Sequence, residues 1–113
     1  MHELGITESI INIVLAKAKE ARASKITDIS LVVGELSGFV PDCIEFYFDV
    51  LSKDTIAQGA TLHFELVPAQ VHCRACLTTF FPQDTQWVCP QCHGLNVEVV
   101  GGRELYVKNM EVE

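Results

Sequence analysis

Four cysteines form two short motifs of the same spacing in the second half of the chain. Cys73 and Cys76 are separated by two residues, and Cys89 and Cys92 repeat that spacing after twelve intervening residues. In a Cys-x-x-Cys knuckle both thiolates point at the centre of a tight turn, so two knuckles bring four sulfurs around one point. Four thiolates suit a tetrahedral zinc ion, with rubredoxin-type iron as the alternative metal. Two disulfides or buried thiols are the alternatives to a metal site, and the doubled pattern favours the metal.

The first residues of the chain offer a second set of metal ligands, rich in nitrogen. If the terminus is free, the Met1 amine, the amide nitrogen of His2 and its imidazole can form fused chelate rings around one cation. Such nearly planar donor sets suit Ni(II) or Cu(II) rather than zinc. The Glu3 amide, a side chain or water can supply a fourth donor. Taken alone, a histidine at position two is more simply a frayed terminal residue.

The other thiol and imidazole side chains receive structural interpretations. His63 falls on the polar face of a predicted strand and is expected to be solvated. His72 precedes Cys73 and is expected to pack against the first knuckle. Cys43 lies among apolar residues and is expected to be a small core residue.

The composition limits the classes of function that fit. The 113 residues suit one domain, or a small domain with a satellite, and 49% of them are hydrophobic. The net charge of −7 argues against a nucleic-acid surface, which would be basic. No apolar run is long enough to cross a bilayer, and the start lacks the features of a signal peptide. We therefore expect a cytoplasmic protein that binds neither nucleic acid nor membrane. The sequence contains no phosphate-binding loop, nucleophile elbow or spaced carboxylate pair, so we expect no enzymatic activity.

Hydrophobic periodicity predicts the elements that position these residues. Residues 6–23 and 41–51 are predicted helices, the second beginning at Pro41 and burying Phe46, Tyr47 and Phe48. Predicted strands cover residues 29–34, 61–67, 78–81, 86–88, 97–100 and 105–112.

This order predicts an α+β fold, a two-layer domain of two helices on a small mixed sheet with an inserted zinc-ribbon-like module. The α+β domain is expected to comprise residues 1–68 plus 103–113, and the module residues 69–102.

Short stretches along the whole chain resemble the HypA/HybF family of hydrogenase nickel-incorporation proteins. The length and the order of the elements also match. The stretches are Met-His-Glu-Leu at 1–4, Val-Gly-Glu-Leu at 33–36, Ala-Gln-Gly-Ala at 57–60, Cys-Pro-Gln-Cys-His-Gly at 89–94 and Lys-Asn-Met-Glu-Val at 108–112.

The resemblance implies a nickel metallochaperone. It implies that the α+β domain binds Ni(II) at the Met-His-Glu start, with His2 essential and with the Met1 amine and Glu3 nearby. It also implies that the four knuckle cysteines hold a structural Zn²⁺. Some family members use a further histidine after the last knuckle, and the histidine that this chain offers is His93, directly after Cys92.

The resemblance also implies partners. These are a GTP-hydrolysing HypB-like protein and the large subunit of [NiFe]-hydrogenase, and some members also serve urease. Whether the working unit is a monomer or a homodimer stays open. The alternative function is a zinc-ribbon adaptor or regulatory protein without nickel transfer. Such an adaptor would need basic and aromatic residues together in its module, but the only basic residues in or next to the module are Arg74 and Arg103.

Overall fold

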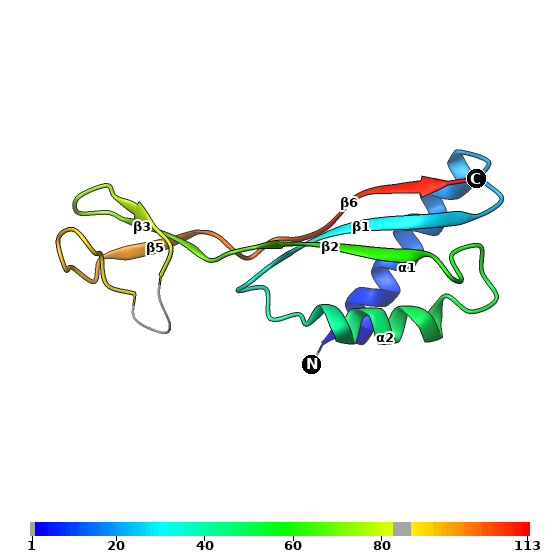
Figure 1. Cartoon of the computed structure of the whole chain (residues 1–113), viewed down its shortest axis with the longest axis horizontal. Coiled ribbons are helices and arrows are strands. Elements are labelled where there is room, and N and C mark those ends of the chain that lie inside the picture. The colour runs from blue at the N-terminus through cyan, green and yellow to red at the C-terminus, as the bar shows by residue number, and fades with distance from the viewer. Residues whose placement is uncertain (1, 83–86) are drawn as a thin grey trace. The chain divides into compact units, whose positions relative to one another are not determined.

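The computed structural model describes residues 2–82 and 87–113, within which lie two helices and six strands. Figure 1 shows the chain and labels most of these elements. The chain forms two compact units. The helical unit comprises Met1–Val32, Gly38–Glu65 and Tyr106–Glu113, and the cysteine unit comprises Val33–Ser37 and Leu66–Leu105. The elements are α1 (Glu3–Glu20), β1 (Ile26–Gly34), α2 (Pro41–Leu51), β2 (Thr61–Val67), β3 (Gln70–Cys73), β4 (Thr79–Phe80), β5 (Val97–Gly101) and β6 (Leu105–Val112).

The larger sheet has the strand order β2-β1-β6 and contains both strand directions. Near the starts of β1 and β2 the Ile26 N–H donates to the Ile56 carbonyl at 2.9 Å. Near their ends the Glu35 N–H donates to the Val67 carbonyl at 2.8 Å, so these two strands are parallel. A parallel pair needs a crossover, and α2 lies within it.

β6 runs antiparallel to β1, which completes the mixed sheet. The Ser24 N–H, before β1, donates to the carbonyl of Glu113, after β6. The Gly34 N–H, at the end of β1, donates to the Glu104 carbonyl just before β6. The predicted α+β architecture, with two helices on a small mixed sheet, is therefore confirmed.

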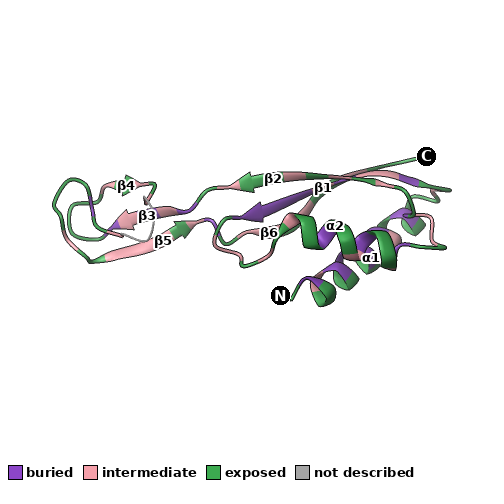
Figure 2. Cartoon of the chain, turned by 60° about the horizontal axis from the view of Figure 1, so that its bottom comes forward, coloured by how far each residue is buried: buried purple, intermediate pink, exposed green. Residues whose placement is uncertain are grey.

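The core of the helical unit lies between the two helices and the sheet. The helices pack against each other, and β1 is the most buried strand (Figure 2). Burying one large aliphatic or aromatic side chain contributes about 1.5–3 kcal/mol, so this layer is the main source of stability. The core residues include Ile10, Ile11, Val14 and Ala18 of α1, Ile29 and Leu31 of β1, and Ile44 and Phe48 of α2.

α1 begins and ends three residues earlier than the predicted 6–23. Its end is fixed by the backbone. Arg22 takes a φ of 56°, and its N–H donates to the Lys19 carbonyl. The Ala23 N–H then donates to the Ala18 carbonyl, which completes a Schellman motif. Because the sequence has no glycine at this turn, hydrophobic periodicity predicted a helix that continues to residue 23.

α2 has the predicted bounds, but only part of its predicted buried side is buried. Phe48 is 1% exposed, whereas Phe46 is 64% exposed, and both Cys43 and Val50 are also exposed. At 3.6 residues per turn, Phe46 lies nearly opposite Ile44, the other buried residue of this helix. The apolar side chains of this helix spread over more than half of its circumference, and an eleven-residue helix packed on one side buries only a narrow stripe.

β3 is the central strand of the cysteine unit and was not predicted. It pairs antiparallel with β4 and β5, in the sheet order β4-β3-β5. Its residues precede the first knuckle, where a polar His72 between apolar neighbours gives a weak strand signal. Of the predicted strand 86–88, residues 87 and 88 are irregular, and residue 86 lies outside the described residues.

Two chain segments of the cysteine unit cross at a pair of glycines. A side chain added at Gly34 would place its Cβ 2.1 Å from the Gly102 carbonyl oxygen, so only glycine allows this approach. The Leu36 N–H donates to the same Gly102 carbonyl at 2.6 Å. The Glu35 carboxylate accepts the Ala69 N–H at 2.7 Å. These bonds tie residues 34–36 to the segments that enter and leave the knuckle region.

None of the described helices is both long enough and apolar enough to span a membrane.

Candidate metal centre

The four knuckle cysteines converge on one point. Their sulfur atoms all lie within 4.8 Å of one another. The Sγ atoms of Cys73 and Cys92 are 3.6 Å apart, and those of Cys76 and Cys89 are 3.4 Å apart. Four sulfurs placed at about 2.3 Å around a tetrahedral ion are about 3.8 Å from one another, close to these values. A disulfide would require about 2.05 Å, and all four cysteines are free thiols. The donor set and its geometry therefore fit a tetrahedral metal.

The two knuckles have the same backbone hydrogen bonds. In the first, the Leu77 N–H donates to the Cys73 carbonyl, and the Cys73 N–H donates to the Thr78 carbonyl. In the second, the His93 N–H donates to the Cys89 carbonyl, and the Cys89 N–H in turn donates to Gly94. The repeated sequence spacing thus becomes a repeated turn. Each turn brings its pair of sulfurs together through these backbone hydrogen bonds.

The turn geometry requires a left-handed residue after each knuckle. Leu77 has a φ of 64° and His93 has a φ of 60°. Neither is glycine, so each position carries a conformational cost of about 1–2 kcal/mol. The same unfavourable φ at both positions indicates that the geometry of the knuckle turn outweighs the backbone preference of the individual residues.

Burial divides the four cysteines into two pairs. Cys73 and Cys89, the first of each knuckle, are fully buried, while Cys76 and Cys92 are exposed. β3 places Cys73 by pairing it with Val97 of β5. The centre is therefore sheltered on one side and faces solvent on the other.

Hydrogen bonds shift the thiol pKa values in opposite directions. The side chain and then the backbone N–H of Thr78 lower the pKa of Cys76 to about 6. The Gly94 N–H lowers the pKa of Cys92, but the thiols of Cys73 and Cys89 oppose it, and the net pKa rises to about 11. Because metal ligation needs thiolates, a bound cation would displace protons from this cluster. Thr78 was not singled out from the sequence, although its place two residues after Cys76 follows from the knuckle pattern.

The other histidines of the described chain lie outside the cluster. His93 is exposed, and its backbone closes the second knuckle. His72 contacts the Thr79 hydroxyl through Nδ1 at 3.1 Å. His63 lies 2.8 Å from the Asp28 carboxylate in the helical unit and is 54% exposed, so it is partly solvated and also paired.

The start of the chain carries an exposed histidine beside a buried carboxylate. His2 is exposed and immediately precedes α1. Glu3 is only 2% exposed, and its Oε2 accepts the Val40 N–H at 3.0 Å, just before α2. The positive amino terminus and the Val40 N–H lower the pKa of Glu3 to about 2. Met1 lies outside the described residues.

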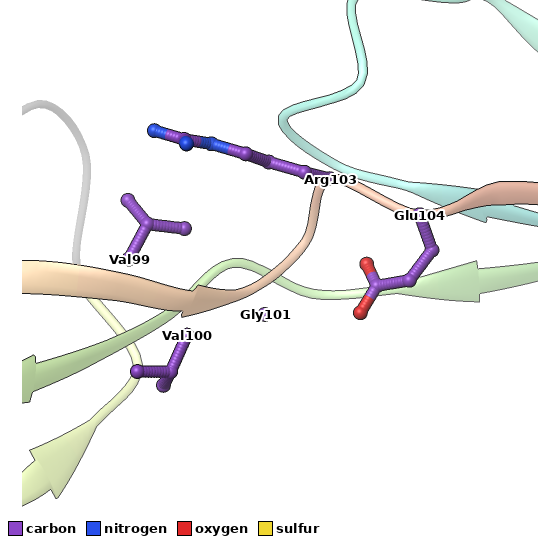
Figure 3. A pocket seen from close by; sticks show the side chains of 5 residues that line it. All are labelled: Val99, Val100, Gly101, Arg103 and Glu104. Carbon is purple, nitrogen blue, oxygen red and sulfur yellow. The ribbon is translucent and has the colours of Figure 1, made fainter.

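A shallow hollow of about 360 Å³ lies in the cysteine unit along residues 99–104 (Figure 3). Val99 and Val100 border it, and the side chains of Arg103 and Glu104 point in different directions. The Glu104 carboxylate accepts the Gly102 N–H at 2.8 Å and so stabilises its own loop. Within the described chain, the cysteine cluster remains the one group of three or more close metal-ligating side chains.

Comparison with known proteins places this arrangement in a family. The family model described as hydrogenase/urease nickel incorporation, metallochaperone, hypA matches residues 1–112. The chain belongs to the HypA family. The resemblance drawn from the short sequence stretches is thereby confirmed.

Relatives share the full length of this HypA-family chain. A hydrogenase maturation factor HypA of Dehalococcoides mccartyi is 47% identical over 113 residues, covering 100% of this chain and 95% of the relative. One from Actinobacillus succinogenes is 41% identical, with 100% of each chain covered.

Solved structures share the fold. A solution structure of a HypA protein superposes with a TM-score of 0.75 at 25% identity, covering 100% of this chain and 97% of that one. The solution structure of the nickel metallochaperone HypA of Helicobacter pylori gives 0.67 at 24% identity, with coverage of 99% and 97%. The second likeness supports the fold alone.

Proposed function

We propose that this chain binds Ni(II) at its amino terminus through His2 and delivers it for maturation of [NiFe]-hydrogenase. The observation that carries the proposal is the family match, which begins at residue 1 and includes the exposed His2. The proteins that it resembles are named as maturation factors, which fits a carrier rather than a catalyst.

The start of α1 suits a nitrogen-rich nickel site. The N–H groups at the beginning of a helix have no intrahelical acceptor, so deprotonating the His2 amide breaks no helical hydrogen bond. The imidazole of His2 makes no hydrogen bond with the described residues and is accessible to a cation. Together with the Met1 amine these groups supply three nitrogens, a donor set that favours Ni(II). The buried Glu3 carboxylate would hold this turn against the start of α2.

The cysteine cluster is proposed to hold a structural Zn²⁺. Its ligands would be Cys73, Cys76, Cys89 and Cys92, whose sulfurs leave no open coordination position at a tetrahedral ion. The metal would stabilise the knuckle region, which has few buried apolar side chains of its own. We further propose residues 69–102 as a zinc-binding domain and residues 1–68 plus 103–113 as the nickel-binding domain.

The proposed pathway contains the partners that the family resemblance implies. Nickel would pass from this chain, with the help of a HypB-like GTPase, to the large subunit of [NiFe]-hydrogenase in the cytoplasm. A carrier must release its cargo, and a solvent-exposed site at the chain terminus with few ligands allows ligand exchange with a partner. His93 is exposed, so its imidazole is accessible as an additional nickel donor.

Nickel titration of two histidine variants tests the proposal. His2→Ala should abolish tight nickel binding in calorimetry while zinc content, measured by mass spectrometry of the metals, stays unchanged. His63→Ala removes a histidine from the same unit and should bind nickel as the parent does. In cells, the His2→Ala chain should fail to support hydrogenase activity. Parental nickel affinity in the His2→Ala chain would overturn the proposal.

A further inference from the structure

A groove of about 290 Å³ runs along the helical unit between α1 and β6. The helix contributes Ile13, Val14 and Lys17, and the strand contributes residues 107–110. Successive residues of a strand point to opposite faces of the sheet. Residues 107–110 can therefore all border one groove only if the groove runs along the edge of the strand. β6 is an outer strand of the β2-β1-β6 sheet (Figure 1), and its second edge is unpaired among the described strands.

The hydrogen bonds of β6 with β1 show which backbone groups face that edge. The Glu113 N–H donates to the Lys25 carbonyl at 2.8 Å, and the Glu113 carbonyl accepts the Ser24 N–H at 2.7 Å. Residues of an antiparallel strand alternate between pointing both groups at the neighbour and pointing both away. The Glu111 carbonyl also faces β1, where it accepts the Thr27 hydroxyl at 3.2 Å. Val112 and Met110, on either side of Glu111, therefore direct their N–H and C=O groups toward the open edge. An exposed strand edge of this kind is a template for another strand.

The groove beside this edge is apolar and cationic. Ile13 of α1, an apolar residue, is 49% exposed. Two ammonium groups and no carboxylate line the groove, although the chain has a net charge of −7. Lys108 is paired with Glu65 at 2.9 Å. Lys17 lies 3.6 Å from Glu20, but both side chains are largely exposed, and such a pair contributes little.

We propose that the open edge of β6 receives an extended acidic peptide segment of a partner protein as a fourth strand of the sheet. Backbone groups of Met110 and Val112 bond the peptide, an apolar peptide side chain contacts Ile13, and a peptide carboxylate pairs with Lys17. A second copy of this chain fits less well, because pairing β6 with its own copy brings two cationic grooves together. This surface is independent of the nickel and zinc sites.

A synthetic peptide provides the test. The probe is a nine-residue peptide of alternating glutamate and valine, and the control replaces each glutamate by lysine. The acidic peptide should bind the full chain saturably, with an affinity that falls as salt is added, while the lysine peptide should not bind. Lys17→Glu should weaken binding about tenfold, because it reverses the charge at the rim. Lys53→Glu, an exposed change outside the groove, should leave the affinity within about twofold.

Amide hydrogen exchange locates the bound peptide. The N–H groups of Met110 and Val112 should exchange more slowly in the complex, whereas that of Glu113 is already bonded to β1 and should change little. Binding without this protection, equal binding of the two peptides, or equal affinity of the Lys17→Glu chain would each overturn the proposal. So would sedimentation of the free chain as a dimer in which the N–H groups of Met110 and Val112 are already protected from exchange.

Discussion

The Glu3 carboxylate joins the starts of the two helices of the helical unit. Glu3 is the buried first residue of α1, and its carboxylate accepts the backbone N–H of Val40, the residue before α2. A buried charge is tolerated when hydrogen bonds and nearby opposite charge compensate for lost solvation. This single residue therefore orients the turn that carries His2.

The lowered pKa of Glu3 predicts a pH-dependent stability. The carboxylate titrates near 4.5 in an unfolded chain and near 2 in the folded one. Because the folded pKa is depressed, the stabilisation is complete above pH 4.5 and is lost as the pH falls toward 2. The parent should thus be more stable than Glu3→Gln near neutral pH, and this difference should shrink in acid. Urea unfolding of both chains at a series of pH values measures it. A difference independent of pH would contradict the role of the charge.

α2 shows how position around a helix decides the energetic value of a residue. Phe48 is buried and Phe46 is exposed, although both are phenylalanines two residues apart. Phe48→Ala should lower the free energy of unfolding by about 3–5 kcal/mol, because it leaves a cavity in the core. Phe46→Ala should change it by less than about 0.5 kcal/mol. Thermal and chemical unfolding measure the loss of unfolding free energy in each variant. Similar losses in the two variants would contradict the burial of Phe48 and the exposure of Phe46.

The bounds of α2 could be predicted from sequence, but its buried face could not. Pro41 fixes the first turn, and the apolar run extends to Leu51, which gives the element. The same run places apolar side chains on both sides of the helix, so periodicity leaves the burial undecided. Only the position of α1 and the sheet selects Ile44 and Phe48. The end of α1 escaped prediction for a related reason, since Arg22 adopts a turn usually given to glycine.

The crossing of Gly34 with Gly102 predicts a strict steric requirement. Gly34→Ala places a methyl group 2.1 Å from a backbone carbonyl, so the strands must separate. Such overpacking should cost about 1–3 kcal/mol of unfolding free energy. Gly5→Ala is the matched control, because Gly5 lies in α1 and a Cβ added there would meet no atom within 4 Å. It should leave stability unchanged or raise it slightly, since alanine favours helix. If Gly34→Ala is as stable as the parent, the close approach is not as described.

At the scale of the molecule, the two units differ in the side chains that they bury. The helical unit has a core of aliphatic and aromatic side chains, whereas the buried side chains of the cysteine unit are few and include two of the knuckle thiols. The doubled cysteine spacing allowed the sulfur cluster of the cysteine unit to be predicted from the sequence. The strand β3 was not visible, because its pairing with β4 and β5 is non-local and its own pattern is weak.

Removing the proposed zinc should therefore affect the two units differently. Trp87, the single tryptophan, lies half-buried in the cysteine unit, so its fluorescence reports on that unit. A strong chelator should change the Trp87 emission and release one zinc per chain, while the far-ultraviolet signal of the helices persists. Loss of the helical signal together with the zinc would show that the helical unit depends on the metal for its stability.

In the function proposed above, the free amino end of the chain, with His2, holds the nickel that is to be delivered. The most direct measurement compares nickel affinity in the chain with a free Met1 amine with that in a chain whose Met1 amine is acetylated. The acetyl group removes the terminal amine as a nickel donor and leaves every side chain intact. We predict that tight nickel binding is lost and that zinc content is unchanged. Equal nickel affinity in the two chains would contradict the account.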